Sequence, residues 1–173
     1  MYIKIFGSVI LLISTTAIGF FKAKELKKRV FCLMELRRTM ILLQGELRFH
    51  RAALSEAFEN VSKRVEEPFS MFLLEASKRI EKRQLGDFGC IWGEMTEELM
   101  TCTSLKNEDK YLLEQLGRGL GYLDLEMQTE SLNQVIYQTE EVIKSAKEQK
   151  EIKEKLYQTM GVTAGAFLVL LII

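Results

Sequence analysis

The sequence predicts an all-α protein, an antiparallel cytoplasmic bundle of about six helices flanked by two transmembrane helices. Three observations lead to this prediction. Apolar residues recur three, four or seven positions apart along most of the chain, which is helical periodicity. No stretch alternates apolar and polar residues with period two, so no sheet is expected. Both ends of the chain are apolar runs in which Lys4 is the only charged side chain.

The two ends have the length and composition of membrane spans. Residues 156–173 carry no charged side chain, and at 1.5 Å per residue they make about 27 Å, close to a hydrocarbon core of roughly 30 Å. Residues 5–21 are also uncharged, and a snorkelling Lys4 extends that segment to about 20 residues. A cleaved signal peptide is the alternative, because the residues from Ser14 to Ala17 are small. The apolar run that continues through Phe21 favours an anchor.

Basic residues set the expected orientation. The segment between the two spans begins and ends with lysine-rich turns, and such clusters mark the cytoplasmic side of a membrane. The predicted organisation is therefore an N-terminal transmembrane helix over 1–21, a cytoplasmic bundle over 22–155 and a C-terminal transmembrane helix over 156–173, with both termini outside. The residues that carry this argument are Lys22, Lys24, Lys27, Lys28 and Arg29, then Lys144, Lys147, Lys150, Lys153 and Lys155.

Apolar stripes place the helices of the bundle. A heptad stripe predicts the first helix over 22–50, continuous with the first span, and the charged segment 124–155 is expected to continue into the second span. Pro68 suits the first turn of the third helix. Residues 84–87 supply a break and an N-cap before the fourth, and Asn107 with Glu108 and Asp109 caps the fifth. The stripes are Leu26, Val30, Leu33, Leu36, Met40, Leu43 and Leu47; Leu54, Ala57, Phe58, Val61 and Val65; Phe69, Phe72, Leu73, Ala76 and Ile80; Phe88, Ile91, Trp92, Met95, Leu99 and Cys102; Leu112, Leu113, Leu116 and Leu120; and Leu125, Leu132, Ile136, Ile143 and Ala146.

Charge and chemistry exclude several functions. Residues 22–155 hold 23 of the 24 basic residues and all 24 acidic ones, and this balance argues against nucleic acid as a partner. The cysteines are far apart in sequence, which favours buried free thiols over a disulfide or zinc. The single histidine, His50, is expected at an exposed helix end. We therefore expect no enzyme activity, no cofactor, no metal site and no small-molecule substrate.

Glycines mark the junction between the fifth and sixth helices. Gly117, Gly119 and Gly121 lie within five residues, although each glycine inside a helix costs about 1 kcal/mol relative to alanine. The spacing fits neither G-x-G-x-x-G nor a P-loop. We therefore interpret the stretch as a close helix contact that ends in a left-handed glycine cap at Gly121, after which Asp124 caps the last helix.

Small residues also recur in the two apolar ends. Gly161 and Gly165 are four residues apart and share one helix face, as do Thr15 and Gly19. Small residues allow transmembrane helices to approach closely. The matching depths favour packing of these two faces within one chain, and a helix from another subunit is the alternative partner. The other possibility is that these glycines have no packing role, because glycine is common in membrane helices.

The glycine junction carries a family resemblance. The order Leu116-Gly117, Leu120-Gly121, Asp124 and Gln128 resembles the L-G-x-x-L-G-x-x-D-x-x-x-Q signature of the stage III sporulation protein AB family of endospore-forming bacteria. The likeness covers nearly the whole chain. One departure is residues 49–54, where the family often has a glycine and a proline before the leucine. The remaining matches are Gly19-Phe20, Leu42-Leu43-Gln44-Gly45-Glu46-Leu47, Trp92, and Lys155-Leu156-Tyr157 through Gly161 and Gly165.

The resemblance implies a role in a channel or secretion-like complex that joins mother cell and forespore. Members of the family are similar to the platform domain of type II secretion and type IV pilus inner-membrane proteins, so a cytoplasmic ATPase and other integral membrane subunits are the implied partners. The implied location is the mother-cell membrane facing the forespore. A self-associating coiled-coil scaffold without an ATPase partner is one alternative, and a sensor with its bundle outside the cell is another, which the lysine distribution opposes.

Overall fold

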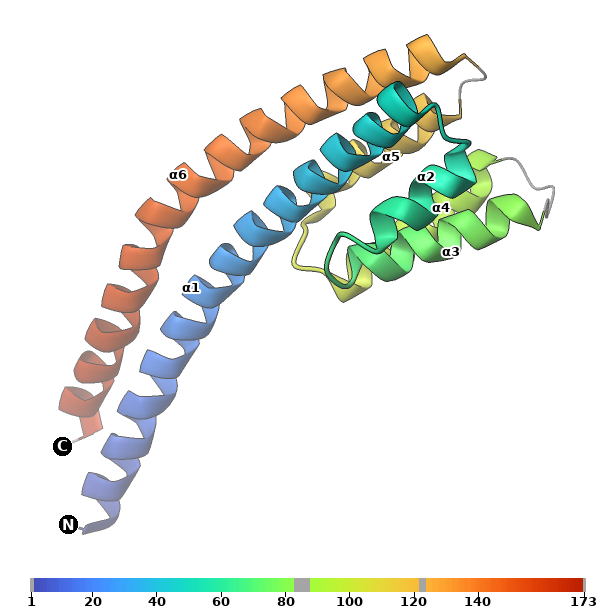
Figure 1. The fold of residues 1–173 in the computed structure, drawn as a ribbon. Helices are drawn as coiled ribbons and strands as arrows, with labels where there is room; N and C mark the ends of the chain where they lie inside the picture. The colour runs from blue at the N-terminus through green and yellow to red at the C-terminus, as the bar shows by residue number, and fades with distance from the viewer. Residues whose placement is uncertain (1, 83–87, 122–123, 173) are drawn as a thin grey trace. The chain divides into compact units, whose positions relative to one another are not determined.

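The chain forms an all-α bundle of six helices, as predicted. The computed structural model describes residues 2–82, 88–121 and 124–172, and these ranges contain helices joined by loops (Figure 1). A π-helical turn follows α1 and a short 3-10 helix precedes α5. The elements in order are α1 (Tyr2–Gly45), the π turn (Glu46–His50), α2 (Leu54–Ser62), α3 (Phe69–Glu81), α4 (Phe88–Cys102), the 3-10 turn (Asn107–Asp109), α5 (Lys110–Leu120) and α6 (Leu125–Ile172).

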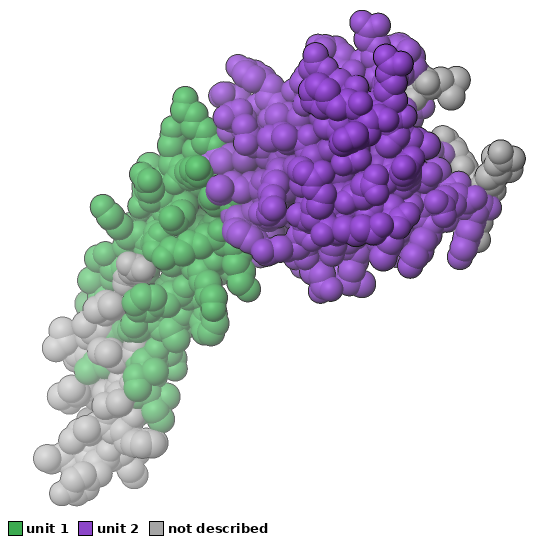
Figure 2. Space-filling view, in the orientation of Figure 1, with its two compact units in different colours: residues 1–30, 144–173 green, residues 31–143 purple. Residues whose placement is uncertain are grey.

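The chain divides into two compact units, which Figure 2 colours separately. Unit 1 consists of residues 1–30 and 144–173, the ends of the two long helices α1 and α6. Unit 2 consists of residues 31–143 and contains the rest of these two helices together with α2–α5. The predicted continuity of each apolar end with its neighbouring amphipathic helix is confirmed, because α1 and α6 each run without interruption from one unit into the other.

Unit 1 pairs α1 with α6. Its buried side chains in the described residues include Ala23, Val30 and Ala146, and an ion pair joins Lys27 Nζ to Glu154 Oε1 at 2.6 Å. No helix in the described part of the chain is both long enough and apolar enough to cross a membrane. The prediction of two transmembrane helices is therefore not confirmed, and the side chains of many residues in those two segments lie outside the described part.

Unit 2 buries the predicted stripes against one another. On α1 the part of the stripe in unit 2, from Leu33 to Leu43, is buried as expected, as is Leu47 of the π turn; of the two stripe residues in unit 1, Val30 is buried and Leu26 is only partly buried. On α6 the prediction was partly wrong, because Val135 and Thr139 are buried while Ile136 is only partly buried. Thr139 can occupy the buried face because its hydroxyl donates to the Val135 carbonyl oxygen at 2.7 Å, which satisfies the polar group locally.

The helix ends around α5 correct one sequence prediction and add detail to another. Gly121 has φ −73° and ψ −8°, so it is not the predicted left-handed cap; its N–H instead continues the helical pattern by donating to Gly117 O at 3.1 Å. Ahead of α5 the residues predicted as its cap, Asn107 to Asp109, form the 3-10 turn, in which the Asp109 carboxylate accepts the Lys106 N–H at 2.9 Å. A left-handed residue does occur at Arg51, with φ 50°, just after the π turn. The break and N-cap predicted for residues 84–87 lie outside the described residues.

The three cysteines are free thiols, but they are not buried as predicted. Cys32 is partly buried, whereas Cys90 and Cys102 are exposed. Cys102 follows the apolar stripe of α4 by spacing, yet it lies in the last turn of that helix. The stripe therefore ends one turn earlier, at Leu99, whose side chain is 3% exposed.

Candidate functional site

The residues of the glycine signature form the corner between α5 and α6. Leu116 and Leu120 are buried in unit 2, at 3% and 1% exposure. Asp124 Oδ2 accepts the Met127 N–H at 3.2 Å, which satisfies one of the free amides in the first turn of α6, as predicted. Gln128 Nε2 donates to Leu120 O at 3.1 Å and so satisfies a carbonyl at the end of α5.

The first glycine of the signature makes room for the only tryptophan. The Trp92 ring of α4 lies directly against Gly117, where a Cβ atom would clash with three atoms of the indole. Trp92 Nε1 donates to Leu113 O at 2.7 Å, which satisfies the polar end of the buried ring. The indole also contacts three phenylalanine rings, Phe72 edge-on at a centroid distance of 5.0 Å, Phe88 at 5.6 Å and Phe58 at 5.9 Å.

A second close contact follows two residues later. A Cβ atom on Gly119 would clash with the side chain of Ser131 on α6. Gly121 has more space, because the nearest atoms to a Cβ there would be at 3.5 Å, an ordinary van der Waals distance. The close helix contact predicted for this stretch therefore involves Gly117 and Gly119, while Gly121 ends α5. The signature thus builds a helix corner, and its glycines touch protein side chains.

Glu46 is a buried carboxylate at the centre of a polar cluster. Its side chain is 8% exposed and lies at the start of the π turn, a helix type that is frequent at functional sites. Its Oε1 accepts from Arg64 Nη1 at 3.1 Å, and its Oε2 accepts from Asn60 Nδ2 at 3.3 Å. His50 Nδ1 lies 3.3 Å from Oε2, and His50 itself is 69% exposed, as expected for a helix-end histidine. Glu46 thus ties the end of α1 to α2 and the residues that follow it.

In unit 1 the structure brings three of the four small residues together. A Cβ on Gly19 would lie 2.5 Å from Tyr157 O and 3.5 Å from the Cα of Gly161. A Cβ on Gly161 would lie 2.9 Å from Thr15 O. Gly165 is buried on the same face of α6. The faces that the sequence pairs within one chain are therefore in backbone contact, and a role in membrane packing stays a prediction.

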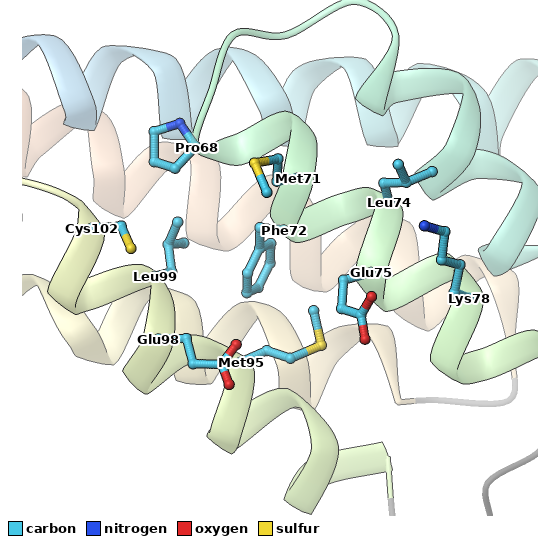
Figure 3. A pocket seen from close by; sticks show the side chains of 10 residues that line it. All are labelled: Pro68, Met71, Phe72, Leu74, Glu75, Lys78, Met95, Glu98, Leu99 and Cys102. Carbon is cyan, nitrogen blue, oxygen red and sulfur yellow. The ribbon is translucent and has the colours of Figure 1, made fainter.

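Sequence reasoning missed a surface pocket between α3 and α4, shown in Figure 3. Its volume is about 310 Å³ and its lining is mainly apolar. The available signal was the pair Met71 and Leu74, apolar residues on α3 outside its predicted stripe, which are 62% and 38% exposed. The lining residues are Pro68, Met71, Phe72, Leu74, Glu75, Lys78, Met95, Glu98, Leu99 and Cys102.

Ion pairs hold the surface around this pocket. Arg79 Nε donates to Glu75 at 2.8 Å, and this hydrogen bond lowers the pKa of the Glu75 carboxyl and raises the pKa of Arg79. Lys110 of α5 pairs with Glu97 of α4, and the hydrogen bond raises the pKa of the lysine. These shifts come from pairing at the surface, which is typical of structural ion pairs.

The arrangement is suited to protein contact. Within residues 2–82, 88–121 and 124–172, no group of three His, Cys, Asp or Glu side chains is placed to hold a metal ion. The most buried carboxylate of the predicted site, Glu46, is taken up by structural hydrogen bonds. What the described surface offers is exposed apolar side chains bordered by charges, a pattern found at protein interfaces.

Comparisons with known proteins agree on one family. The model of the family described as stage III sporulation protein AB matches residues 4–173. The stage III sporulation protein AB of Bacillus subtilis (strain 168) is 25% identical over 170 residues, which cover 98% of this chain and 99% of the relative. A solved structure titled stage III sporulation protein AB (SpoIIIAB) is similar with a TM-score of 0.65 at 20% identity, over 72% of this chain and 98% of the solved one.

The two kinds of match support different statements. At 20% identity the solved structure shows a shared fold. The family match covers almost every residue, including both apolar ends and the whole glycine corner. The chain belongs to the stage III sporulation protein AB family.

Proposed function

We propose that this chain is a non-enzymatic platform or scaffold subunit of a sporulation-specific complex, the SpoIIIA complex, that forms a channel or secretion-like path between mother cell and forespore. The observation that carries the proposal is the family match over residues 4–173. The structure supports a binding role, because large apolar side chains such as Phe31, Met71 and Phe49 are exposed on its described surface.

We further propose that residues 1–21 and 156–173 span the mother-cell membrane that faces the forespore, with residues 22–155 in the cytoplasm. The contact of Gly19 with Gly161 supports this assignment, since close backbone approach is how helices pack in lipid. The lysines that flank both segments support the orientation.

Thiol labelling tests the topology. The native cysteines are replaced by serine, and one cysteine is introduced at Tyr137, which is 67% exposed. A membrane-impermeant maleimide should label this cysteine only after the cells are permeabilised, whereas a cysteine added after Ile173 should react in intact cells. Labelling of Tyr137→Cys in intact cells would place the bundle on the opposite side and so rule out a cytoplasmic platform.

The expected partners are a cytoplasmic ATPase of the secretion type and other integral membrane subunits of the same complex. Affinity purification of the full chain from sporulating cells, in mild detergent, should recover both. Gly117→Leu, which disrupts the corner beside Trp92, should lose the ATPase, whereas Gly93→Leu, where a Cβ meets nothing within 4 Å, is the matched control and should keep it. Recovery of the membrane subunits without any ATPase would favour a scaffold that works without one.

A self-associating coiled coil is the alternative scaffold. It would use the heptad stripe of α1 between copies of the chain. In the structure this stripe is already buried inside unit 2, because Leu33, Met40 and Leu43 are each 0% exposed. A coiled coil through the same residues would require unit 2 to open, so the fold favours the platform over this alternative.

A further inference from the structure

α1 carries a second stripe, on the side opposite its buried one. We define the outer stripe as Phe31, Met34, Arg38 and Ile41 of α1 together with Phe49 of the π turn that continues it, all within unit 2. The four apolar members are 54%, 46%, 40% and 78% exposed, and the Arg38 side chain is 54% exposed. Four large apolar side chains left in solvent along one helix are a stronger signal than single exposed residues, which are normal on protein surfaces.

The outer stripe has the spacing of a helix-binding face. From Phe31 its members follow at intervals of three, four and three residues, and Gly45 and Phe49 continue the line at intervals of four. Intervals of three and four keep residues on one side of a helix, which is how helices meet partner helices. At 1.5 Å per residue the stripe is about 27 Å long, enough for five turns of a bound helix.

The charge around the outer stripe is basic. Arg38, Arg48 and Arg51 are exposed. The two carboxylates in the same part of the chain, Glu35 and Glu46, have side-chain exposures of only 14% and 8%. Arg38 Nη1 lies 3.6 Å from Glu35 Oε2, too far for a strong hydrogen bond, so its guanidinium can still bind a further carboxylate.

We propose that the outer stripe of α1 docks an acidic amphipathic helix of another protein, whose apolar residues cover Met34 and Ile41 and whose carboxylates pair with the arginines. This inference refines the proposed scaffold function by naming the docking face and the chemistry of the partner. It does not require the partner to be an ATPase.

Two other occupants fit the charges less well. A second copy of the chain, paired through the same stripe, would bring the Arg38 side chains of both copies together, and like charges at an interface are unfavourable. A membrane surface suits basic residues at the two edges of an apolar face. Arg38 instead lies on the centre line of the stripe, between Met34 and Ile41, where an ion pair with a partner helix is the better match.

Gly45 is consistent with close approach of a partner helix. It lies on the line of the outer stripe at the end of α1, and a Cβ added there would meet nothing within 4 Å. Gly117 and Gly119 are explained by neighbours in the same chain, but Gly45 is not. A helical glycine costs about 1 kcal/mol relative to alanine. Close approach of a helix from another protein would explain why Gly45 is a glycine.

Photo-crosslinking of the full chain in sporulating cells tests the proposal. The photoreactive amino acid p-benzoylphenylalanine replaces Met34 or Ile41, and a control chain carries it at Tyr137 on α6, which is more exposed than either. The crosslinked peptide is identified by mass spectrometry. We expect adducts from Met34 and Ile41 with a peptide of another protein that is net acidic and has apolar residues at helical spacing.

Charge variants show whether the arginine selects the partner. Arg38→Glu should lower the adduct yield from Ile41 at least tenfold, whereas Arg38→Lys should keep most of it. Lys82→Glu, an exposed control with the same change in net charge, should leave the yield unchanged.

Several outcomes would overturn the proposal. They are adducts with a second copy of the chain, adducts with lipid alone, no adduct at either position, or a yield that Arg38→Glu does not change. If the unmodified chain recovers no ATPase in affinity purification, this counts against an ATPase platform and leaves the docking face standing. If Met34 and Ile41 give no crosslink, or crosslink only to a second copy of the chain or to lipid, this counts against the docking face and leaves the scaffold function standing.

Discussion

Two helix contacts in this protein use glycine in opposite ways. In unit 2, Gly117 leaves space that the large Trp92 ring fills, and the indole brings Phe58, Phe72 and Phe88 around it. In unit 1, Gly19 and Gly161 leave space that backbone fills, because Tyr157 O and Thr15 O are the nearest atoms.

The difference follows from what drives each contact. In water, covering a large aromatic side chain contributes most, since burial of a Trp or Phe removes some 150–250 Å² from solvent. Between lipid-embedded helices there is no hydrophobic drive, so close backbone approach and dispersion are what remain. The tryptophan contact is thus of the kind expected in a water-exposed bundle, and the backbone contact is of the kind expected in lipid.

The largest expected effect is on the tryptophan contact. Trp92→Ala should lower the free energy of unfolding by about 3–5 kcal/mol, because it leaves a large cavity among three phenylalanines and leaves the Leu113 carbonyl without its donor. Urea unfolding of the full chain in mild detergent, followed by circular dichroism at 222 nm, measures this. A loss below about 1 kcal/mol would show that the aromatic cluster does not hold unit 2 together.

Alanine in place of glycine separates the crowded position from open ones. Gly117→Ala should destabilise by about 1–3 kcal/mol, because its methyl group overlaps the Trp92 ring. Gly93→Ala in α4 is the matched control, since nothing lies within 4 Å of a Cβ there, and it should stabilise by about 1 kcal/mol. If both substitutions shift the urea midpoint in the same direction, packing against Trp92 does not explain Gly117.

Gly121→Ala tests whether Gly121, at the end of α5, is helical and not a left-handed cap. The residue has helical φ and ψ, and its Cβ would make only ordinary contacts at 3.5 Å. The substitution should therefore be neutral or stabilise by about 0.5 kcal/mol, because alanine loses less backbone entropy than glycine on folding. A left-handed cap would instead make alanine destabilising. The same urea titration distinguishes the two.

The sequence was sufficient for the order of the helices but not for their ends. Stripes such as Leu33–Met40–Leu47 depend only on helical periodicity and burial, and these residues are buried as predicted. Gly121 was misjudged because a glycine that follows an apolar turn is compatible with both a left-handed and a helical cap. The choice depends on where the next helix begins, which is a tertiary property.

The site was predictable in part for a similar reason. The signature residues were identified, but the neighbour of Gly117 was not, because Trp92 lies 25 positions earlier and no local pattern links the two. Residues 107–109 were predicted as a cap, but only the geometry shows that they form a 3-10 turn in which Asp109 accepts the Lys106 N–H. The outer stripe of α1 was hidden by the stronger buried stripe on the same helix.

Cysteine crosslinking tests the other half of the comparison, the backbone contact in unit 1. In a chain whose native cysteines are replaced by serine, Thr15→Cys with Gly165→Cys should form a disulfide within one chain under mild oxidation. Adding Gly19→Leu should reduce the yield severalfold, because its side chain would push against Tyr157 O. Gly7→Leu is the control, since a Cβ there meets nothing within 4 Å.

The products distinguish the two possible partners of the glycine face. Disulfides between chains only would assign the contact to different subunits. A yield that Gly19→Leu leaves unchanged would mean that small residues are not what brings the two helices together.

The smallest expected effect concerns surface ion pairs, which both units possess. Arg79 donates to Glu75 at 2.8 Å in unit 2, and Lys27 pairs with Glu154 at 2.6 Å in unit 1. In each pair the hydrogen bond from the basic group lowers the pKa of the carboxyl below 4.5. A carboxyl with a lowered pKa in the folded state adds stability above pH 4.5, and this contribution is lost as the pH falls through the folded pKa.

Both units should therefore lose stability as the pH falls. In this they behave alike, whereas they use glycine in opposite ways. For Glu75, which is 46% exposed, solvent screening limits the contribution to about 0.3–0.5 kcal/mol. Glu75→Gln should lower the urea midpoint slightly at pH 7 and by less at pH 3, because the pair is lost as the pH falls through the lowered pKa of the wild-type carboxyl. Glu108→Gln is the control at an exposed carboxylate 3.5 Å from Lys106, a longer pair that should contribute less.

A Glu75→Gln effect of equal size at both pH values would show that the side chain acts through packing. The stability of unit 2 would then rest on shape, as it does at Trp92 and Gly117, with little contribution from charge.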